Sequence, residues 1–422
     1  MSMRARNRLV GQLAWVSAGR LGAALLQAVT LVVTARAVAP SEFGLLAGVL
    51  GLATLVQTFS DCGMASFVSR ERAADSDSGS IRSALRFNSL TSLLLLGLLS
   101  AGLVVASLAL DPIYALMIPL ALWASGERNA DTRLVVVFAD GDVWINVSNL
   151  VMRRLLALAI VLALTSADVE PVLSYCVGVA VGATLSSVAA RLIVQPRLPP
   201  EDTMTVREVL REARPYWVHS VATQARNLDT MLVAMIASPL QAGFYSSASR
   251  LTNPLLLIPS SLASLVLPTA SRAVSTGSSL RPVLKAIVIV VGGMSTAYAI
   301  IFVLAPTLIP AVLGDAYTSS VPVLRIVLVG LPFAAWTSLF ASLLQGRGDK
   351  TFVARTSLAM IVVSLSLVCL GAFLGGARGA SGGLSVALAI HSVLLTVVFL
   401  SVRRKKKENW EPASVSIRAQ RD

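Results

Sequence analysis

Charged residues are scarce in this chain, and so are the residue types on which most catalytic and metal sites depend. Only 14% of its 422 residues are charged, against about 25% in a typical soluble domain. Its two histidines and three cysteines stand far apart, and it contains no Cys-x-x-Cys pair, no Ser/His/Asp set and no Walker A loop. The sequence therefore predicts no metal site, no cofactor, no ATP hydrolysis and no enzyme activity.

Apolar residues are abundant instead. They make up 55% of the chain and give a mean hydropathy of +0.76. Several apolar runs exceed the length of about 20 residues that a helix needs to cross a bilayer. The net charge of +13 does not indicate nucleic-acid binding, because the basic residues gather in alternate loops between these runs. The composition predicts an all-α polytopic membrane protein.

Twelve segments are long and apolar enough to cross the membrane as helices. They are predicted at residues 12–35, 43–65, 87–109, 113–138, 144–165, 171–193, 214–237, 242–267, 284–305, 321–344, 351–374 and 380–402. Lys and Arg gather on one side, whereas the opposite loops hold only Arg36 and Arg378 beside four acidic residues. The positive-inside rule then predicts a multi-pass protein of the cell (inner) membrane with both termini in the cytoplasm.

Internal echoes predict two six-helix lobes that arose by duplication, arranged around a central cavity. The echoes are Pro40 and Gly44 with Pro239 and Gly243 or a neighbour, PLALW at 119–123 with PFAAW at 332–336, and Gly141-Asp142 with Gly348-Asp349. The predicted units are an N-terminal lobe at 1–193, a cytoplasmic linker at 194–213 that begins a short amphipathic helix, a C-terminal lobe at 214–402 and a basic cytoplasmic tail at 403–422.

Basic residues inside the predicted spans are the candidate binding groups, since a lipid-facing charge at mid-membrane costs about 3 kcal/mol. The deepest of them are expected to face a watery cavity between helices, with neutral polar groups beside them. Arginine binds phosphate in bidentate fashion, and amides suit sugar hydroxyls, so the cavity favours a bulky, polar, anionic solute. The predicted substrate-binding residues are Arg20, Arg153, Arg226, Arg250, Asn146, Asn149 and Gln27.

A few titratable residues in the spans are candidates for ion coupling or for structural ion pairs. Glu127, Arg128 and Asp131 share about a 100° arc of one helix and are expected to neutralise one another or to take part in coupling. Asp229 follows Arg226 by three residues and is its candidate partner. His219 lies on the same polar stripe and is either a hydrogen-bonded core residue or a proton carrier. The glycine-rich stretch 375–383 is predicted to be an external turn.

Two hairpin sequences carry a family resemblance. They are RLGAALLQAVTLVVTARAVAPSEFGLLAGVLGLATLVQTFSDCGMASFVSRE at 20–71 and NLDTMLVAMIASPLQAGFYSSASRLTNPLLLIPSSLASLVLPTASR at 227–272. They resemble the hairpins that open the two halves of the polysaccharide flippases, which export lipid-linked oligosaccharides and belong to the multidrug/oligosaccharidyl-lipid/polysaccharide (MOP) exporter superfamily. The resemblance implies alternating access, a cargo of undecaprenyl-diphosphate-linked glycan, and cavity arginines at Arg20 and Arg250. The charged fourth span, ASGERNADTR, departs from the family pattern.

Three active functions compete, and a fourth option, a purely structural membrane partner, leaves the buried arginines unexplained. The first is a flippase that works among membrane lipids and beside glycosyltransferases and a glycan polymerase, with Arg20, Arg226 and Arg250 holding the diphosphate. The second is a cation-coupled multidrug exporter of the same superfamily, which needs accessible cavity carboxylates. The third is a membrane-embedded glycan polymerase or ligase, which needs reactive residues in its external loops, and those loops are short.

Overall fold

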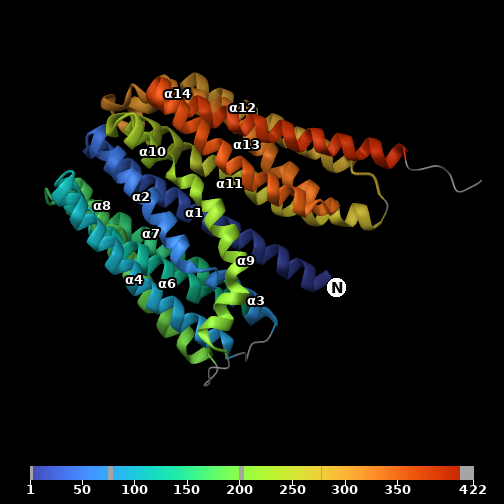
Figure 1. The fold of residues 1–422 in the computed structure, drawn as a ribbon, viewed down its shortest axis with the longest axis horizontal. Coiled ribbons are helices and arrows are strands. Elements are labelled where there is room, and N and C mark those ends of the chain that lie inside the picture. The colour runs from blue at the N-terminus through green and yellow to red at the C-terminus, as the bar shows by residue number, and fades with distance from the viewer. Residues whose placement is uncertain (1–2, 75–78, 199–203, 277, 409–422) are drawn as a thin grey trace, which may run out of the picture.

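The computed structural model describes residues 3–74, 79–198, 204–276 and 278–408, and these ranges are helical throughout apart from short turns (Figure 1). Within them some side chains, including that of His219, are not described. The helices are α1 Met3–Ala37, α2 Pro40–Asp61, α3 Met64–Ala74, α4 Ser80–Ala109, α5 Ile113–Leu116, α6 Pro119–Ala139, α7 Val143–Ser166, α8 Pro171–Val194, η1 Gln195–Arg197, α9 Val206–Gln224, η2 Ala225–Leu228, α10 Asp229–Ile236, α11 Pro239–Ser275, α12 Arg281–Leu313, η3 Asp315–Tyr317, α13 Ser320–Arg347 and α14 Lys350–Glu408. The predicted all-α fold is confirmed, and each of the twelve predicted spans coincides with one or more of these helices.

Eight helical segments of the described chain are long and apolar enough to cross a membrane on their own. The fourth crossing, α6, falls outside this set because it carries four charged residues between Glu127 and Arg133. The single helix α14 holds the last two predicted spans, which separate at Gly375 and Gly376, where the backbone leaves the helical region. Mean hydropathy therefore identifies a membrane-crossing helix most readily when apolar residues cover all of its faces.

The glycine-rich stretch at 375–383 is mostly helix, which corrects the expectation of a nine-residue external turn. Only Gly375 and Gly376 are non-helical, and Gly376 has a positive φ of 56°. The later glycines serve packing instead, since a Cβ at Gly379 would lie 2.0 Å from the Gly371 carbonyl oxygen. Both halves of α14 therefore pack backbone to backbone directly after a two-residue turn.

The helices form two bundles that contact each other at one end and diverge toward the other (Figure 1). The first bundle contains α1–α8 and the second contains α10–α14. At the joined end, α2 contacts α10 and α11, and α1 contacts α11 and α12. Arg36 there donates from Nη1 to the Ala311 carbonyl at 3.4 Å, and the rings of Phe43 and Tyr317 meet edge to face at 6.1 Å. By the topology predicted from Lys and Arg, this joined end lies on the outer side of the membrane.

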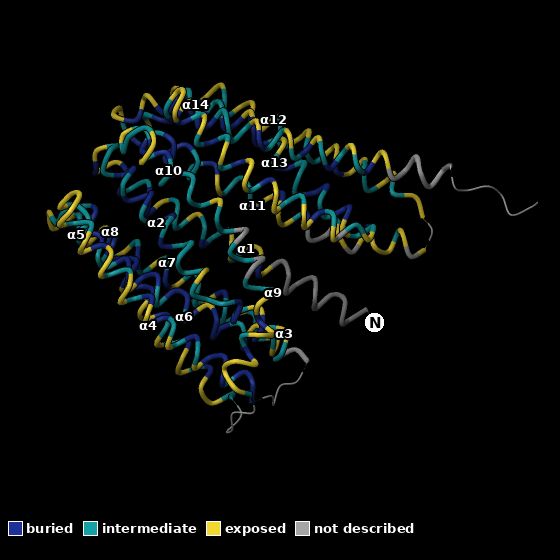
Figure 2. The backbone as a smooth tube through the Cα atoms, viewed as in Figure 1, coloured by how far each residue is buried: buried dark blue, intermediate teal, exposed yellow. Residues whose placement is uncertain are grey.

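Figure 2 shows buried residues inside both bundles, and the hydrophobic clusters that they form follow the same division. One cluster extends across both bundles at the joined end and includes Phe43, Tyr245 and Tyr317. At the open end each bundle has a cluster of its own, around Phe67 in the first and around Phe340 in the second. The bundles can therefore move relative to each other at the open end without breaking either core.

A reciprocal contact between two glycines brings α2 and α11 together at the joined end. A Cβ at Gly44 would lie 2.0 Å from the Pro239 carbonyl oxygen, and a Cβ at Gly243 would lie 1.8 Å from the Pro40 carbonyl oxygen. Gly44 thus contacts Pro239, which is the counterpart of Pro40 in the other half. Gly243 in turn contacts Pro40, the counterpart of Pro239. This exchange is what a local two-fold relation between duplicated halves produces, and it depends on the absence of both side chains.

The other echoes differ in how well they correspond. Gly141 and Gly348 both have positive φ, at 91° and 106°, and each is followed by an aspartate that precedes the next helix. The tryptophan motifs do not correspond, because Pro119 begins α6 whereas Pro332 lies inside α13. Two of the three echoes therefore mark equivalent local structures, and the third does not.

The linker expected at 194–213 contains η1 and the first turns of α9, which begins with a capping box between Thr205 and Glu208. The start of α9 is amphipathic and buries Val209 in the cluster of the first bundle. Further along, Trp217 donates from Nε1 to the Phe59 carbonyl at 2.8 Å. The contacts of the first bundle thus extend beyond residue 193, well into the seventh span.

Three segments at the open end of the first bundle are joined by ion pairs around Asp140. Arg72 of α3 pairs with Asp140 at 2.7 Å, and Arg197 of η1 pairs with Asp140 at 3.3 Å and with Asp142 at 2.8 Å. Partial burial raises the pKa of Asp140, but hydrogen bonds from Arg72 and Arg197 outweigh it and leave the pKa below its ordinary value. The ionised carboxylate therefore stabilises the folded state.

The Asp140→Asn variant is expected to lower the free energy of unfolding by up to about 1 kcal/mol at pH 7, the upper range for a solvent-accessible ion pair. Because the folded-state pKa is depressed, this contribution is present above the unfolded pKa of about 3.9 and is lost as the pH falls through the folded value. Thermal unfolding in detergent at pH 7 and near pH 3 measures both. Asp111→Asn, at an exposed site with no ion pair in the described chain, is the control. An equal deficit at both pH values would contradict the assignment.

Candidate functional site

Arg20 and Gln27 lie on the same side of α1 as Leu31. At 100° per residue, Arg20, Gln27 and Leu31 fall within about 40° of one another around the helix. Leu31 is buried in the cluster that the two bundles share, Gln27 is half-buried and Arg20 is exposed. Arg20 forms no ion pair with a described residue. Its guanidinium therefore stands where the bundles have already diverged.

Arg250 connects the two bundles directly. It follows Gly243 by two turns of α11, so the two residues lie within about 20° of each other on the face that crosses α2. Its Nη2 donates to the Ala47 carbonyl of α2 at 3.1 Å. Arg250 is half-buried and keeps further N–H groups beyond this bond. It thus lies just inside the joined end, between the bundles.

Arg226 is exposed and lies in η2, a 3₁₀ segment in the middle of the seventh span. The adjacent Asn227 carbonyl packs on α2, since a Cβ at Gly51 would lie 2.2 Å from it. η2 therefore faces the first bundle, as the crossing face of α11 does. A 3₁₀ stretch inside a helix often marks a hinge or a functional site.

Asp229 is hydrogen-bonded to Tyr245 and forms no direct ion pair with Arg226, although the charge of Arg226 still acts on its carboxylate. Tyr245 donates its hydroxyl to Oδ2 of Asp229 at 2.8 Å, and the Thr230 backbone N–H donates to Oδ1 at 2.6 Å. Both carboxylate oxygens are thus occupied, and the 3₁₀ turn changes the helical spacing on which the expectation rested. The sequence feature that predicts Tyr245 as the partner is the turn at Ser238. This turn folds the chain back and places Asp229 and Tyr245 at the same level on adjacent helices.

Glu127 and Asp131 pair with arginines of the next helix. Arg154 lies 2.6 Å from Glu127, and Arg153 lies 2.8 Å from Asp131 and 3.6 Å from Glu127. Trp123 also donates its indole N–H to Glu127. Arg153 is buried and these carboxylates balance its charge, so it is not a free cation in a cavity. Spacing along one helix did not show these pairs, because they join α6 to α7.

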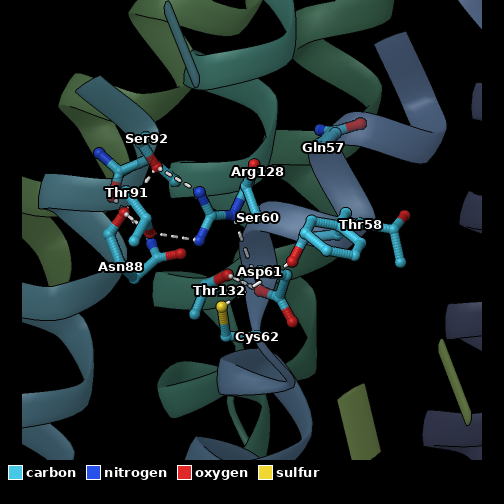
Figure 3. A network of polar contacts seen from close by, with 12 residues as sticks. Gln57, Thr58, Ser60, Asp61, Cys62, Asn88, Thr91, Ser92, Arg128 and Thr132 are labelled. Atoms are coloured by element: carbon cyan, nitrogen blue, oxygen red, sulfur yellow. Dashed lines mark hydrogen bonds and ion pairs between the residues drawn. The ribbon is translucent and has the colours of Figure 1, made fainter. Parts of the chain in front are cut away.

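Arg128 forms its polar contacts with α4 and α2 and not with Glu127 or Asp131, which corrects the expectation that the three neutralise one another (Figure 3). Its side chain points from α6 between two neighbouring helices, α4 and α2. On α4, Thr91 accepts from Nη2 at 2.6 Å, and on α2 the carboxylate of Asp61 lies 3.9 Å from Nε. Figure 3 shows Ser92 on the α4 side and Thr132 beside Asp61. These contacts hold the interior of the first bundle together.

Both predicted asparagines lie on α7 of the first bundle. Asn149 exchanges hydrogen bonds with Ser186 of α8, inside the first bundle. Asn146 is half-buried one turn before it on α7. The side chain of His219 lies outside what the structure describes. In the described chain, no group of three or more His, Cys, Asp or Glu side chains is placed to hold a metal ion.

The Glu127→Gln variant is expected to lower the free energy of unfolding by about 3 kcal/mol, because removing one partner of a buried ion pair leaves uncompensated charge on the arginines. Thermal unfolding followed by tryptophan fluorescence in detergent measures the loss. Asp131→Asn is the matched comparison, and its expected loss is smaller because the Asp131 side chain is 54% exposed. A larger loss for Asp131→Asn would contradict this account of the cluster.

Solved structures share this architecture. An inward-facing multidrug resistance MATE family transporter of the MOP superfamily matches with a TM-score of 0.73 and 15% identity, over 92% of this chain and 96% of that chain. The lipid II flippase MurJ, in an inward closed conformation, matches with a TM-score of 0.68 and 14% identity, over 92% and 87%. An outward-facing MATE transporter matches with a TM-score of 0.63 and 16% identity, over 94% and 96%.

The chain therefore shares the fold of these membrane transporters. Residues 9–274 match the model of a family described as polysaccharide biosynthesis proteins. The chain belongs to this family, and the resemblance seen in its sequence is confirmed. The named neighbours are transporters and a flippase rather than enzymes. No curated protein sequence matches the chain.

Proposed function

We propose that the protein is a flippase that carries an undecaprenyl-diphosphate-linked oligosaccharide from the cytoplasmic to the outer leaflet by alternating access. The observation that carries the proposal is the pair Arg20 and Arg226. Both side chains are exposed, η2 packs on α2 of the first bundle through the Asn227 carbonyl, and neither arginine forms an ion pair with a described residue. Unpaired guanidinium groups in a membrane-spanning region call for an anionic ligand.

The paired residues contribute less to this cargo site. Arg153 is neutralised by Glu127 and Asp131, and Asn149 bonds within its own bundle. We therefore assign the diphosphate to Arg20, Arg226 and the remaining N–H groups of Arg250, and sugar contacts to Gln27. Asn146 stays a predicted sugar contact.

The membrane potential supplies a driving force under this proposal. A diphosphate carries about two negative charges, and an inside-negative potential favours outward movement by about 2.3 kcal/mol per charge per 100 mV. The open end of the bundles then faces the cytoplasm and admits the headgroup, while the lipid tail stays in the bilayer. Coupling through Asp229, His219, Glu127 or Asp131 remains a prediction. Glycosyltransferases and a glycan polymerase are the expected neighbours in the pathway.

Two observations favour this proposal over a cation-coupled drug exporter or a polymerase. The carboxylates of Glu127 and Asp229 are occupied by Arg154 and Tyr245, so they are not free to bind a cationic drug. The described turns at the joined end are short, and Glu170 there caps α8 through the Leu173 N–H. Membership of a polysaccharide biosynthesis family and a fold shared with a lipid II flippase support a lipid-linked glycan.

A strain that lacks the gene tests the function. It is expected to lose the exported polysaccharide and to accumulate lipid-linked oligosaccharide that a membrane-impermeant periodate label reaches only after permeabilisation. Single repeat units that are labelled in intact cells would indicate a polymerase instead. Drug sensitivity with normal polysaccharide would indicate a multidrug exporter.

A further inference from the structure

The helix α12 stands apart from its neighbours in the second bundle. Only 11% of its most apolar stretch is buried, against 44% for α13, on which it rests. It has few contacts with α11, although the two helices are consecutive in the chain. This separation leaves crevices on both sides of α12 toward the open end.

The crevice between α11 and α12 has a volume of about 340 Å³. Val266 of α11, Ala286 and Val290 of α12 and Leu339 of α13 are among the residues that line it. Among its described lining residues, Thr269 alone has a polar side chain. A second crevice of about 350 Å³ lies on the other side of α12 and is lined in part by Trp336. Both are open grooves at the surface of the second bundle.

Basic side chains stand where the α11–α12 crevice ends. Arg281 and Lys285 lie one turn apart at the start of α12, and both are exposed. Neither forms an ion pair with a described residue. Arg272 is exposed in the last turn of α11, and the sequence from 230 to 314 contains no Asp or Glu. The polar end of the groove is therefore cationic, directly beside Pro282 of its apolar lining.

We infer that this groove binds an anionic phospholipid of the cytoplasmic leaflet. One acyl chain lies between α11 and α12, and the phosphate contacts Arg281 and Lys285. This site depends on the groove alone and is independent of the cargo proposed above.

The length of the groove identifies its occupant. From Pro282 to Val290 the lining advances eight residues, or about 12 Å along the helix. One leaflet of the hydrocarbon core is about 15 Å deep. The groove thus matches an acyl chain that enters from the cytoplasmic surface, whereas a long polyprenyl chain would need a track through both leaflets. The occupant also anchors a helix that has few protein contacts.

Native mass spectrometry of delipidated protein titrated with phosphatidylglycerol or phosphatidylcholine of matched chains tests the inference. Phosphatidylglycerol is expected to bind more tightly. The double variant Arg281→Ala/Lys285→Ala is expected to weaken its binding about 30-fold, as two surface cations near an anionic lipid imply, and to remove the preference. Ala286→Trp fills the groove and is expected to weaken the binding of both lipids. Ile289→Trp is the control, because Ile289 is 73% exposed and does not line the groove.

Photo-crosslinking on the wild-type chain provides a second measurement that does not depend on the folding of any variant. A phosphatidylglycerol with a photoreactive acyl chain is expected to label residues between Pro282 and Val290. Equal affinity of the wild type for the two lipids would overturn the inference. So would wild-type binding by Ala286→Trp, or crosslinks confined to other helices.

Discussion

The Gly44→Leu variant is expected to lose transport and to populate a state in which the bundles separate at the joined end. A Cβ at Gly44 would lie 2.0 Å from the Pro239 carbonyl oxygen and 2.5 Å from the Gly243 nitrogen, and backbone atoms cannot move aside as a side chain can. Overpacking of this kind costs about 1–3 kcal/mol or more. Since 1.4 kcal/mol is a factor of ten, this cost should lower the population of the joined state by about 5-fold to 150-fold.

The reciprocal contact predicts the same phenotype for Gly243→Leu, and a milder one for the alanine variants. Gly97→Leu is the control, because no atom lies within 4 Å of its added Cβ. Spin labels at Ala167→Cys and Ala316→Cys, both exposed near the joined end, report the separation by pulsed electron resonance after the native cysteines are replaced. Unchanged distances in both glycine variants would show that this crossing does not hold the joined state.

The double variant Arg20→Ala/Arg226→Ala is expected to reduce glycan export at least about 100-fold. A hydrogen bond to a charged group contributes about 1.5–3 kcal/mol, and the two side chains together exceed the 2.8 kcal/mol that a factor of 100 requires. Both side chains are exposed and form no ion pair with a described residue, and Asp229, which lies near Arg226, keeps its hydrogen bonds from Tyr245 and Thr230 when Arg226 is removed. The fold should therefore survive, and the loss should appear in export alone.

Single substitutions refine this test. Arg20→Lys keeps the charge but loses the bidentate geometry, so export should be intermediate. Arg378→Ala removes an exposed arginine just after the turn inside α14 and should export normally. Arg250→Ala is less discriminating, because Arg250 also bonds to Ala47 across the bundles. Normal export by Arg20→Ala/Arg226→Ala at wild-type protein levels would exclude the two arginines as cargo ligands.

The sequence was sufficient to predict the membrane crossings, since each depends on local composition. A run of apolar residues is helical in a bilayer whatever surrounds it, because its backbone must satisfy its own hydrogen bonds. The sequence also pairs Gly44 with Gly243, but it does not show that the two residues contact each other's segments. The matched positions suggested equivalent places in two halves, and the structure shows that these places contact each other.

The ion pairs could not be predicted, because they join residues on different helices. Arg153 had no acidic neighbour on its own helix, so it was expected to be free, yet Glu127 and Asp131 reach it from α6. Arg128 likewise pairs with Asp61 of α2. Helical spacing shows which side chains share a face, but it does not show which helix packs against that face. Net charge counted along single helices therefore overestimates the number of free cations.

Binding of a polyprenyl diphosphate and of the neutral polyprenyl alcohol to purified protein tests the central claim most directly. If the exposed guanidinium groups hold the diphosphate, the wild type should bind the diphosphate at least about 100-fold more tightly than the alcohol. The Arg20→Ala/Arg226→Ala variant should lose most of this preference while it binds the alcohol unchanged. An equal preference in the two proteins would contradict the account.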